Sequence, residues 1–202
     1  RIDAILSKPV GLPPTGLYGL IDLIGLDVMH SVGKNLEVNL PESDKGKAFV
    51  NLPEAELKLY NKGQLGRKTG GGFYRIRKNN DGEKIKEVFN LESESWEISK
   101  KEKADINGFN LILEESLEGK YIWNVMGHSL LYAAGLIPEI TDDIVNIDNA
   151  MKWGFAWQKG PFEILDSIGP NKVIEKCYKL NIKLPKMLEV IKNSSHNTFY
   201  ST

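Results

Sequence analysis

The sequence contains one cysteine, Cys177, and therefore has no internal disulfide framework. Such sparing use of cysteine fits a reducing compartment, and we expect a cytoplasmic protein. The formal net charge is −1, so there is no basic excess of the kind that drives binding to nucleic acid. No stretch approaches the roughly 18 apolar residues that a membrane-spanning helix needs, and no signal peptide is visible.

Motifs for nucleotides and metals are also missing. A dinucleotide-binding fold would show a strand, then G-x-G-x-x-G, then a helix, and this pattern does not occur. In the stretch LGRKTGGGFY, residues 65–74, the lysine and threonine precede the glycines, which is the reverse of a Walker loop. The histidines His30, His128 and His196 are far apart and belong to no ligand-spaced cluster, so we predict no metal site.

Helix signals dominate the sequence that remains. Apolar residues recur at helical spacing between Thr15 and Gly33, which predicts one helix with Thr15 as its N-cap and Gly33 at its end. The spacing around Cys177 makes it a small core residue of another helix. Further helices are predicted at 53–63, 120–135 and 141–154, and at the prolines Pro161, Pro170 and Pro185.

The middle of the chain has a different character. Alternating runs flank Asp81-Gly82, and this dipeptide between such runs is a strong signal for a β-hairpin. The following residues, 92–108, are polar and charged with few apolar anchors. We interpret them as a solvated surface linker, with Trp96 fixing one end, in preference to a charged binding tail.

The chain also resembles itself. The hexapeptide LIDLIG at 20–25 matches ILDSIG at 164–169, and Asp3 and Asp148 precede them at similar distances. Two later pairs follow in the same order: NLPEAE with KLPKML, and GGFY with NTFY. Four landmarks in one order indicate a tandem duplication.

The fold class that follows is mainly α, with two tandem helical-bundle units related by duplication and a β-hairpin inserted between them. The predicted bounds are 1–75 for the first unit, which lacks its leading helix, 76–118 for the hairpin and charged linker, and 119–202 for the second unit. Because the chain opens at Arg1 in the middle of this pattern, we expect it to be a piece of something longer.

Three stretches carry a resemblance to a known family: GLYGLIDLIGLDVM, GRKTGGGFY and IDNAMKWGFAWQKGPFEILDSIG. They resemble the C-terminal helical domain of the 3-hydroxyacyl-CoA dehydrogenases of fatty-acid β-oxidation. In that family the domain often occurs as two tandem copies, and the hairpin-bearing insert is similar to the bacterial long-chain forms. The resemblance covers the chain except for about 76–118.

The resemblance implies oxidation of a 3-hydroxyacyl-CoA to the 3-oxoacyl-CoA by hydride transfer to NAD. The NAD site and the histidine–glutamate pair that removes the hydroxyl proton would belong to an N-terminal Rossmann domain absent from this sequence. The chain alone is therefore expected to bind no cofactor and to be inactive. The implied partners are the acyl-CoA substrate, that Rossmann domain and a second copy in a homodimer.

Three residues are candidates for a functional site. The resemblance aligns Asn124 with the catalytic asparagine of the family, although Val125 follows it where the family has arginine. Arg67 and Lys68, beside the glycines of 65–74, are candidates for contacts with a CoA phosphate. For that stretch as a whole we favour a structural bend over a CoA contact, with glycines that supply positive φ and an aromatic pair that anchors the next strand.

Other groups are assigned structural roles. Asp22 and Asp166 occupy the same repeat position within apolar helices, and we expect each to cap a neighbouring helix end. His30 is expected at a helix end and His128 as a buried, hydrogen-bonded histidine. The aromatic residues Trp153, Phe155, Trp157 and Phe162 are expected to pack in the core, with an acyl-chain groove as the alternative.

Two other functions stay open at this point. One is a non-catalytic helical scaffold that binds a partner or an acyl ligand, which a start codon directly upstream would favour. The other is a sister family that acts on sugar acids or smaller hydroxy acids. Its helical domains are seldom duplicated in this way, which weakens that alternative.

Overall fold

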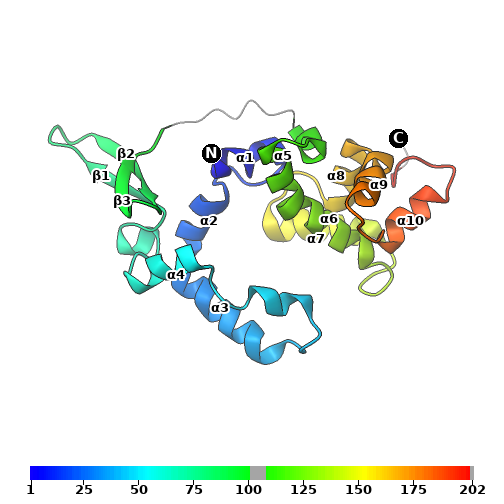
Figure 1. Ribbon diagram of the computed structural model, residues 1–202, viewed down its shortest axis with the longest axis horizontal. Coiled ribbons are helices and arrows are strands. Elements are labelled where there is room, and N and C mark those ends of the chain that lie inside the picture. The colour runs from blue at the N-terminus through cyan, green and yellow to red at the C-terminus, as the bar shows by residue number, and fades with distance from the viewer. Residues whose placement is uncertain (101–107, 201–202) are drawn as a thin grey trace. The chain divides into compact units, whose positions relative to one another are not determined.

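A computed structural model describes residues 1–100 and 108–200 of the 202-residue chain (Figure 1). The protein is mainly helical and has one three-stranded antiparallel sheet. It divides into two compact units, one formed by residues 15–102 and the other by 1–14 together with 103–202. This division differs from the domain bounds predicted from the sequence repeat. Those bounds, 1–75, 76–118 and 119–202, stay a prediction. Residues 101–107 of the predicted linker lie outside the described residues.

The unit of residues 15–102 places three helices beside the sheet. Its buried core joins Ile21, Leu26 and Leu59 from the helices to Phe73 and Phe89 from the sheet region. The elements are α2 (Leu17–Ile24), α3 (Leu26–Asn39), η2 (Lys45–Phe49), α4 (Glu54–Asn61), η3 (Arg67–Thr69), β1 (Tyr74–Lys78), β2 (Lys84–Asn90) and β3 (Ser95–Ile98).

The single helix predicted from Thr15 to Gly33 is wrong. Gly25, with φ +102, separates α2 from α3, and α3 runs through Gly33 to Asn39. Gly33 is a close-approach glycine, because a Cβ there would lie 2.2 Å from the carbonyl oxygen of Val50. The N-cap of α2 is Gly16, and the hydroxyl of Thr15 has no hydrogen-bond partner among the described residues.

The predicted hairpin is confirmed. Strands β1 and β2 pair in antiparallel fashion from Tyr74 opposite Val88 to Lys78 opposite Lys84 (Figure 1). The expectation of a plain linker after the hairpin is wrong at 95–98, which form β3 against β2. Trp96 explains the difference, because its ring packs edge-on against that of its cross-strand partner Phe89, at 5.2 Å between centroids.

In the other unit, all regular secondary structure among the described residues is helical. Its first segment is anchored to the rest by a hydrogen bond of 2.9 Å from the Gln158 amide to the Gly11 carbonyl. Its elements are α1 (Ile2–Ile5), η1 (Lys8–Val10), η4 (Gly108–Leu113), α5 (Leu117–Ile122), the π-helical turn η5 (Trp123–Gly127), α6 (His128–Gly135), α7 (Ile144–Phe155), α8 (Pro161–Ile168), α9 (Pro170–Lys179) and α10 (Lys186–Lys192).

Most helix predictions in this unit are confirmed. The helix expected at 120–135 is present as α5, η5 and α6, and Pro161 and Pro170 begin α8 and α9. The cap of α7 is Asp143 instead of Thr141, because the Asp143 carboxylate accepts the Val145 amide at 2.9 Å. Pro185 directly precedes α10.

The core of this unit is centred on α8, which contacts α6, α7 and α9. Phe162 and Leu165 of α8 are fully buried, as is Cys177 of α9. Burial raises the pKa of the Cys177 thiol to about 11, in keeping with a core residue. Core packing was the wrong expectation for Trp153 and Phe155, which are 81% and 64% exposed.

Candidate functional site

The glycine stretch of 65–74 closes around the buried carboxylate of Asp22. Asp22, on α2, is 2% exposed. Its Oδ1 accepts the backbone N–H of Phe73 at 2.8 Å, and its Oδ2 accepts that of Tyr74 at 2.7 Å. The carboxylate thus fixes the start of β1 against α2.

The glycines make this approach possible. A Cβ at Gly66, where φ is +128, would lie 2.4 Å from the backbone oxygen of Asp22. A Cβ at Gly72 would lie 2.1 Å from the Asp22 carboxylate. Thr69 closes the turn, since its hydroxyl lies within hydrogen-bond distance of the carbonyls of Gly66 and Gly71. The stretch therefore acts as a structural bend.

The two cations of the bend project from η3 and are both exposed. The Lys68 ammonium lies 2.5 Å from Oδ1 of Asp27 on α3, and this hydrogen-bonded ion pair lowers the pKa of Asp27. Arg67 has no ion pair with another described residue. The structure thus places Arg67 and Lys68 side by side on the surface, with the charge of Lys68 already matched.

The hexapeptide at 164–169, the counterpart of 20–25 in the repeat, contains an aspartate that makes the same kind of contact as Asp22. Oδ1 of Asp166, on α8, accepts the backbone N–H of Phe199 at 2.8 Å, and its Oδ2 accepts that of Tyr200 at 2.9 Å. The structural role expected for Asp22 and Asp166 is correct, but the amides that they bind belong to Phe-Tyr segments instead of a helix end.

Asp148, on α7, has a related role that the sequence did not reveal. Its carboxylate accepts the N–H groups of Phe162 and Glu163 at 2.8 and 3.0 Å, and so caps α8 from a neighbouring helix. The hydroxyl of Tyr200 donates to the same carboxylate at 2.8 Å. Burial raises the pKa of Asp148, because these hydrogen bonds only partly offset the loss of solvation.

In the sequence, a glycine is the only sign that Asp148 caps α8. Gly160 precedes α8 and has no side chain to cap it, and a Cβ there would lie 2.2 Å from the Cβ of Asp148. The close approach lets a residue 12 positions upstream replace the missing cap. Glu163 completes the junction, accepting the Gly160 amide at 2.8 Å and pairing with Lys152 at 2.6 Å.

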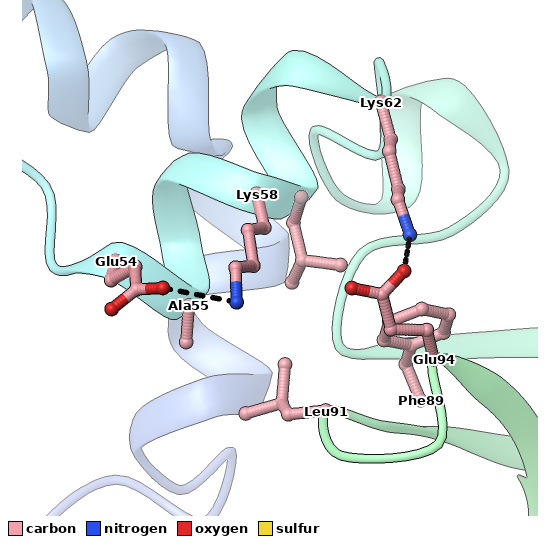
Figure 2. Close-up of a pocket in the computed structure, with 8 residues that line it drawn as sticks. Glu54, Ala55, Lys58, Lys62, Phe89, Leu91 and Glu94 are labelled. Atoms are coloured by element: carbon pink, nitrogen blue, oxygen red, sulfur yellow. Dashed lines mark hydrogen bonds and ion pairs between the residues drawn. The ribbon is translucent and has the colours of Figure 1, made fainter.

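One cavity, of about 250 Å³, lies between α4 and the β2–β3 turn (Figure 2). Figure 2 shows that its two ammonium groups point to carboxylates: Lys58 to Glu54 at 3.0 Å, and Lys62 to Glu94. Because both charges are matched, this cavity offers no spare cation to an anionic ligand.

A second cavity, of about 380 Å³, contains the predicted residue Asn124. Asn124 lies on the π-helical turn η5 and is exposed, and His128, one turn later, lines the same cavity. Lys176 of α9 also lines it. Asn124 belongs to the compact unit of residues 1–14 and 103–202, whereas Arg67 and Lys68 belong to the unit of residues 15–102.

Two of the three histidines, His30 and His128, have surroundings that differ from the expectation. His30 lies within α3, not at its end, and its ring stacks near that of Tyr60 at 4.8 Å between centroids. His128 was expected to be buried and is exposed. His196 is exposed and its amide donates to the Ser194 hydroxyl at 3.1 Å.

The charged side chains of these sites hold backbone amides and pair with one another. Within residues 1–100 and 108–200, no group of three or more histidine, cysteine, aspartate or glutamate residues is placed to hold a metal ion. Over the same residues, no helix combines the length and the apolar character that crossing a bilayer would require.

Comparisons with known proteins place these features in a family context. Residues 1–76 match the 3-hydroxyacyl-CoA dehydrogenase C-terminal domain. The chain is 41% identical over 194 residues, 93% of its length, to a "Putative fatty acid oxidation complex trifunctional enzyme" of Rickettsia felis. It is 31% identical over 211 residues, 99% of its length, to a "Probable 3-hydroxyacyl-CoA dehydrogenase" of Bacillus subtilis.

A Rickettsia prowazekii protein, also named a putative fatty acid oxidation complex trifunctional enzyme, is 38% identical over 191 residues. The chain spans 26% of the length of each of these three relatives. The family resemblance seen in the sequence is confirmed.

Proposed function

We propose that this chain is the substrate-side, C-terminal portion of an NAD-dependent 3-hydroxyacyl-CoA dehydrogenase. The complete enzyme would oxidise 3-hydroxyacyl-CoA to 3-oxoacyl-CoA in the β-oxidation of fatty acids, in the cytoplasm. The observation that carries the proposal is the similarity over 93% and 99% of the chain to relatives named for these activities.

The described residues do not fit NAD themselves. Their only sheet is antiparallel, whereas a dinucleotide-binding site needs parallel strands and a glycine-rich turn that opens a helix. In the proposal the hydride acceptor and the catalytic base therefore belong to an N-terminal domain of the longer protein. The role of this chain is to close over the acyl-CoA bound against that domain.

We propose further that the two copies of the repeat arose by duplication. Three equivalences support this: Gly25 and Gly169 join consecutive helices at φ +102 and +95, Asp22 and Asp166 accept Phe-Tyr amides, and a proline precedes both α4 and α10. The first copy, 1–75, would face the active site. The second, 119–202, would support it and contribute to a homodimer.

Two groups are proposed to contact substrate. Arg67, with Lys68 beside it, would meet a CoA phosphate, and Arg67 is the better candidate because Lys68 is paired with Asp27. Asn124 would contact the oxygen of the substrate. The alternative, which Val125 at the position of the family's arginine favours, is that Asn124 makes no such contact and the second copy serves as structure.

The central test compares the longer protein with this chain. With a 3-hydroxyacyl-CoA and NAD, the longer protein should form NADH, followed by absorbance at 340 nm, and the 202-residue chain should form none. Absence of NADH formation by the longer protein, with a folded NAD-binding domain, would favour the non-catalytic scaffold.

The CoA contact has a separate test in the longer protein. Arg67→Gln should raise KM several-fold for a 3-hydroxyacyl-CoA but leave KM unchanged for the matching N-acetylcysteamine thioester, which lacks the CoA phosphates. Lys78→Gln, an exposed cation at the end of β1, is the control. Equal effects of Arg67→Gln on both thioesters would exclude the phosphate contact.

A further inference from the structure

The cavity of about 380 Å³ beside η5 and α9 contains a buried cation with few partners. Lys176 is only 7% exposed. Its ammonium donates to the carbonyl of Leu113 at 3.3 Å and lies 3.7 Å from the carboxylate of Glu115, a side chain that is itself 76% exposed. An ammonium has three donors, and burial without full pairing is costly. Lys176 can therefore accept a further anionic partner.

A second buried donor lines the same cavity. Trp123 is 4% exposed, and its indole N–H is buried without a hydrogen-bond acceptor among the described residues. The Lys176 ammonium lies over the Trp123 ring, 5.2 Å from its centroid, in a cation–π contact. A buried N–H without an acceptor costs stability, which a ligand oxygen would restore.

The rest of the wall indicates the size and polarity of the ligand. The π-helical turn brings Trp123 and Asn124 to one cavity, and π turns are frequent at functional sites. Asn124 and His128 add further polar groups, while Leu180 and Ile182 give an apolar wall. Ligand pockets span roughly 300 to 1,000 Å³, so this cavity suits a small molecule.

We propose that this cavity binds a short-chain carboxylate, with its carboxylate at the Lys176 ammonium and the Trp123 indole N–H and its chain against Leu180 and Ile182. The apolar wall of Leu180 and Ile182 favours such an anion over inorganic phosphate. The inference needs only residues of the unit that contains 108–200, and its two binding donors, Lys176 and Trp123, have no part in the proposed dehydrogenase function.

The test is titration of the ¹⁵N-labelled 202-residue chain with sodium butyrate, followed by NMR. The chain has four tryptophans, so four indole N–H signals are expected, and Trp123→Phe identifies one of them by its loss. Butyrate should shift the Trp123 signal downfield in a saturable way and leave the signals of Trp96, Trp153 and Trp157 in place. Inorganic phosphate at equal ionic strength should produce a much smaller shift.

Paired variants test the role of the charge. Lys176→Met, which keeps the aliphatic stem, should weaken butyrate binding about tenfold or more, because a charge-assisted hydrogen bond is lost. Lys179→Met, an exposed lysine on the same helix, should leave the affinity unchanged. Lys176→Arg tests the site if the methionine variant does not fold.

Several outcomes would overturn the proposal. One is a Trp123 signal in the unmodified chain that stays fixed at saturating butyrate, as expected if the cavity holds only water. Another is a shift of equal size with phosphate or with neutral butyramide. A folded Lys176→Met variant that binds butyrate as well as the Lys179→Met control would also exclude it. None of these results depends on NADH formation by the longer protein.

Discussion

The carboxylates of Asp22 and Asp166 bind the chain in the same way: each accepts the backbone amides of a Phe-Tyr pair, at 2.7 to 2.9 Å. Both aspartates lie on a helix that ends at a glycine with positive φ, and in each case the Phe-Tyr pair follows more than 30 residues later. By accepting hydrogen bonds from two backbone amides, one aspartate side chain holds a segment distant in sequence against its helix.

Removal of either carboxylate should destabilise the compact unit that contains it. Asp22→Ala leaves two backbone amides without acceptors, and we expect a loss of about 2 to 4 kcal/mol in the free energy of unfolding. Asp166→Ala should act in the same direction, though less, because Asp166 is only half-buried. Urea unfolding followed by circular dichroism measures both, with exposed Asp142→Ala as the control. If Asp22→Ala and the control were equally stable, the structural role assigned to the Asp22 carboxylate would be contradicted.

The glycine bend should not tolerate a methyl group where it meets Asp22. Gly72→Ala would place a Cβ 2.1 Å from the carboxylate, so the amide contacts must break or the backbone must shift. We expect a loss of about 2 kcal/mol or more, the usual scale for overpacking. Gly154→Ala is the matched control, since its Cβ meets nothing within 4 Å and alanine favours a helix. Thermal melting of both variants should show a lowered midpoint for Gly72→Ala alone.

Acid should weaken the sheet through Glu87. This carboxylate on β2 lies 2.6 Å from the Nε of Arg75 and 3.1 Å from that of Arg77, and these hydrogen-bonded ion pairs lower the pKa of Glu87. A lowered folded-state pKa means that the stabilisation is complete above the unfolded value of about 4.3 and is lost as pH falls through the folded value.

Unfolding midpoints in urea between pH 6 and pH 3 measure this effect. Glu87→Gln should be less stable than the unmodified chain at pH 6 and should show a smaller further loss on acidification. Glu92→Gln, which replaces an exposed carboxylate in the turn after β2, should follow the unmodified chain. The same acid dependence in Glu87→Gln as in the unmodified chain would remove Glu87 from the explanation.

Alkali should loosen the last residues of the chain through Tyr200. Burial and the hydrogen bond from its hydroxyl to Asp148 raise the pKa of Tyr200. The stabilisation is therefore complete below the unfolded value of about 10 and is lost as pH rises toward the folded value. Of seven tyrosines, one should ionise late in an absorbance titration at 295 nm, and Tyr200→Phe should remove that step. Tyr132→Phe, at an exposed position, should retain it.

The sequence by itself determined the helical class, the hairpin and the repeat landmarks. These depend on local chemistry: apolar spacing, prolines at helix starts and an Asp-Gly turn act within a few residues. The same reasoning identified LGRKTGGGFY as a bend, because the order of lysine and glycine excludes a Walker loop. It also excluded the dinucleotide motif and assigned Asp22 and Asp166 a structural role.

Only the tertiary structure decided which distant groups meet. Gly25 interrupts a helix and Gly33 does not, and this difference depends on the residues around each glycine. Gly33, for example, faces the carbonyl of Val50. Strand β3 forms because β2 offers it an edge and Phe89 packs against Trp96, and neither fact is local. The cavity of Lys176 and Trp123 is likewise invisible in sequence, because 53 residues separate two donors that folding brings together. The helix break, strand β3 and the cavity all depend on burial and on contacts between residues far apart in the chain, and local sequence patterns encode neither.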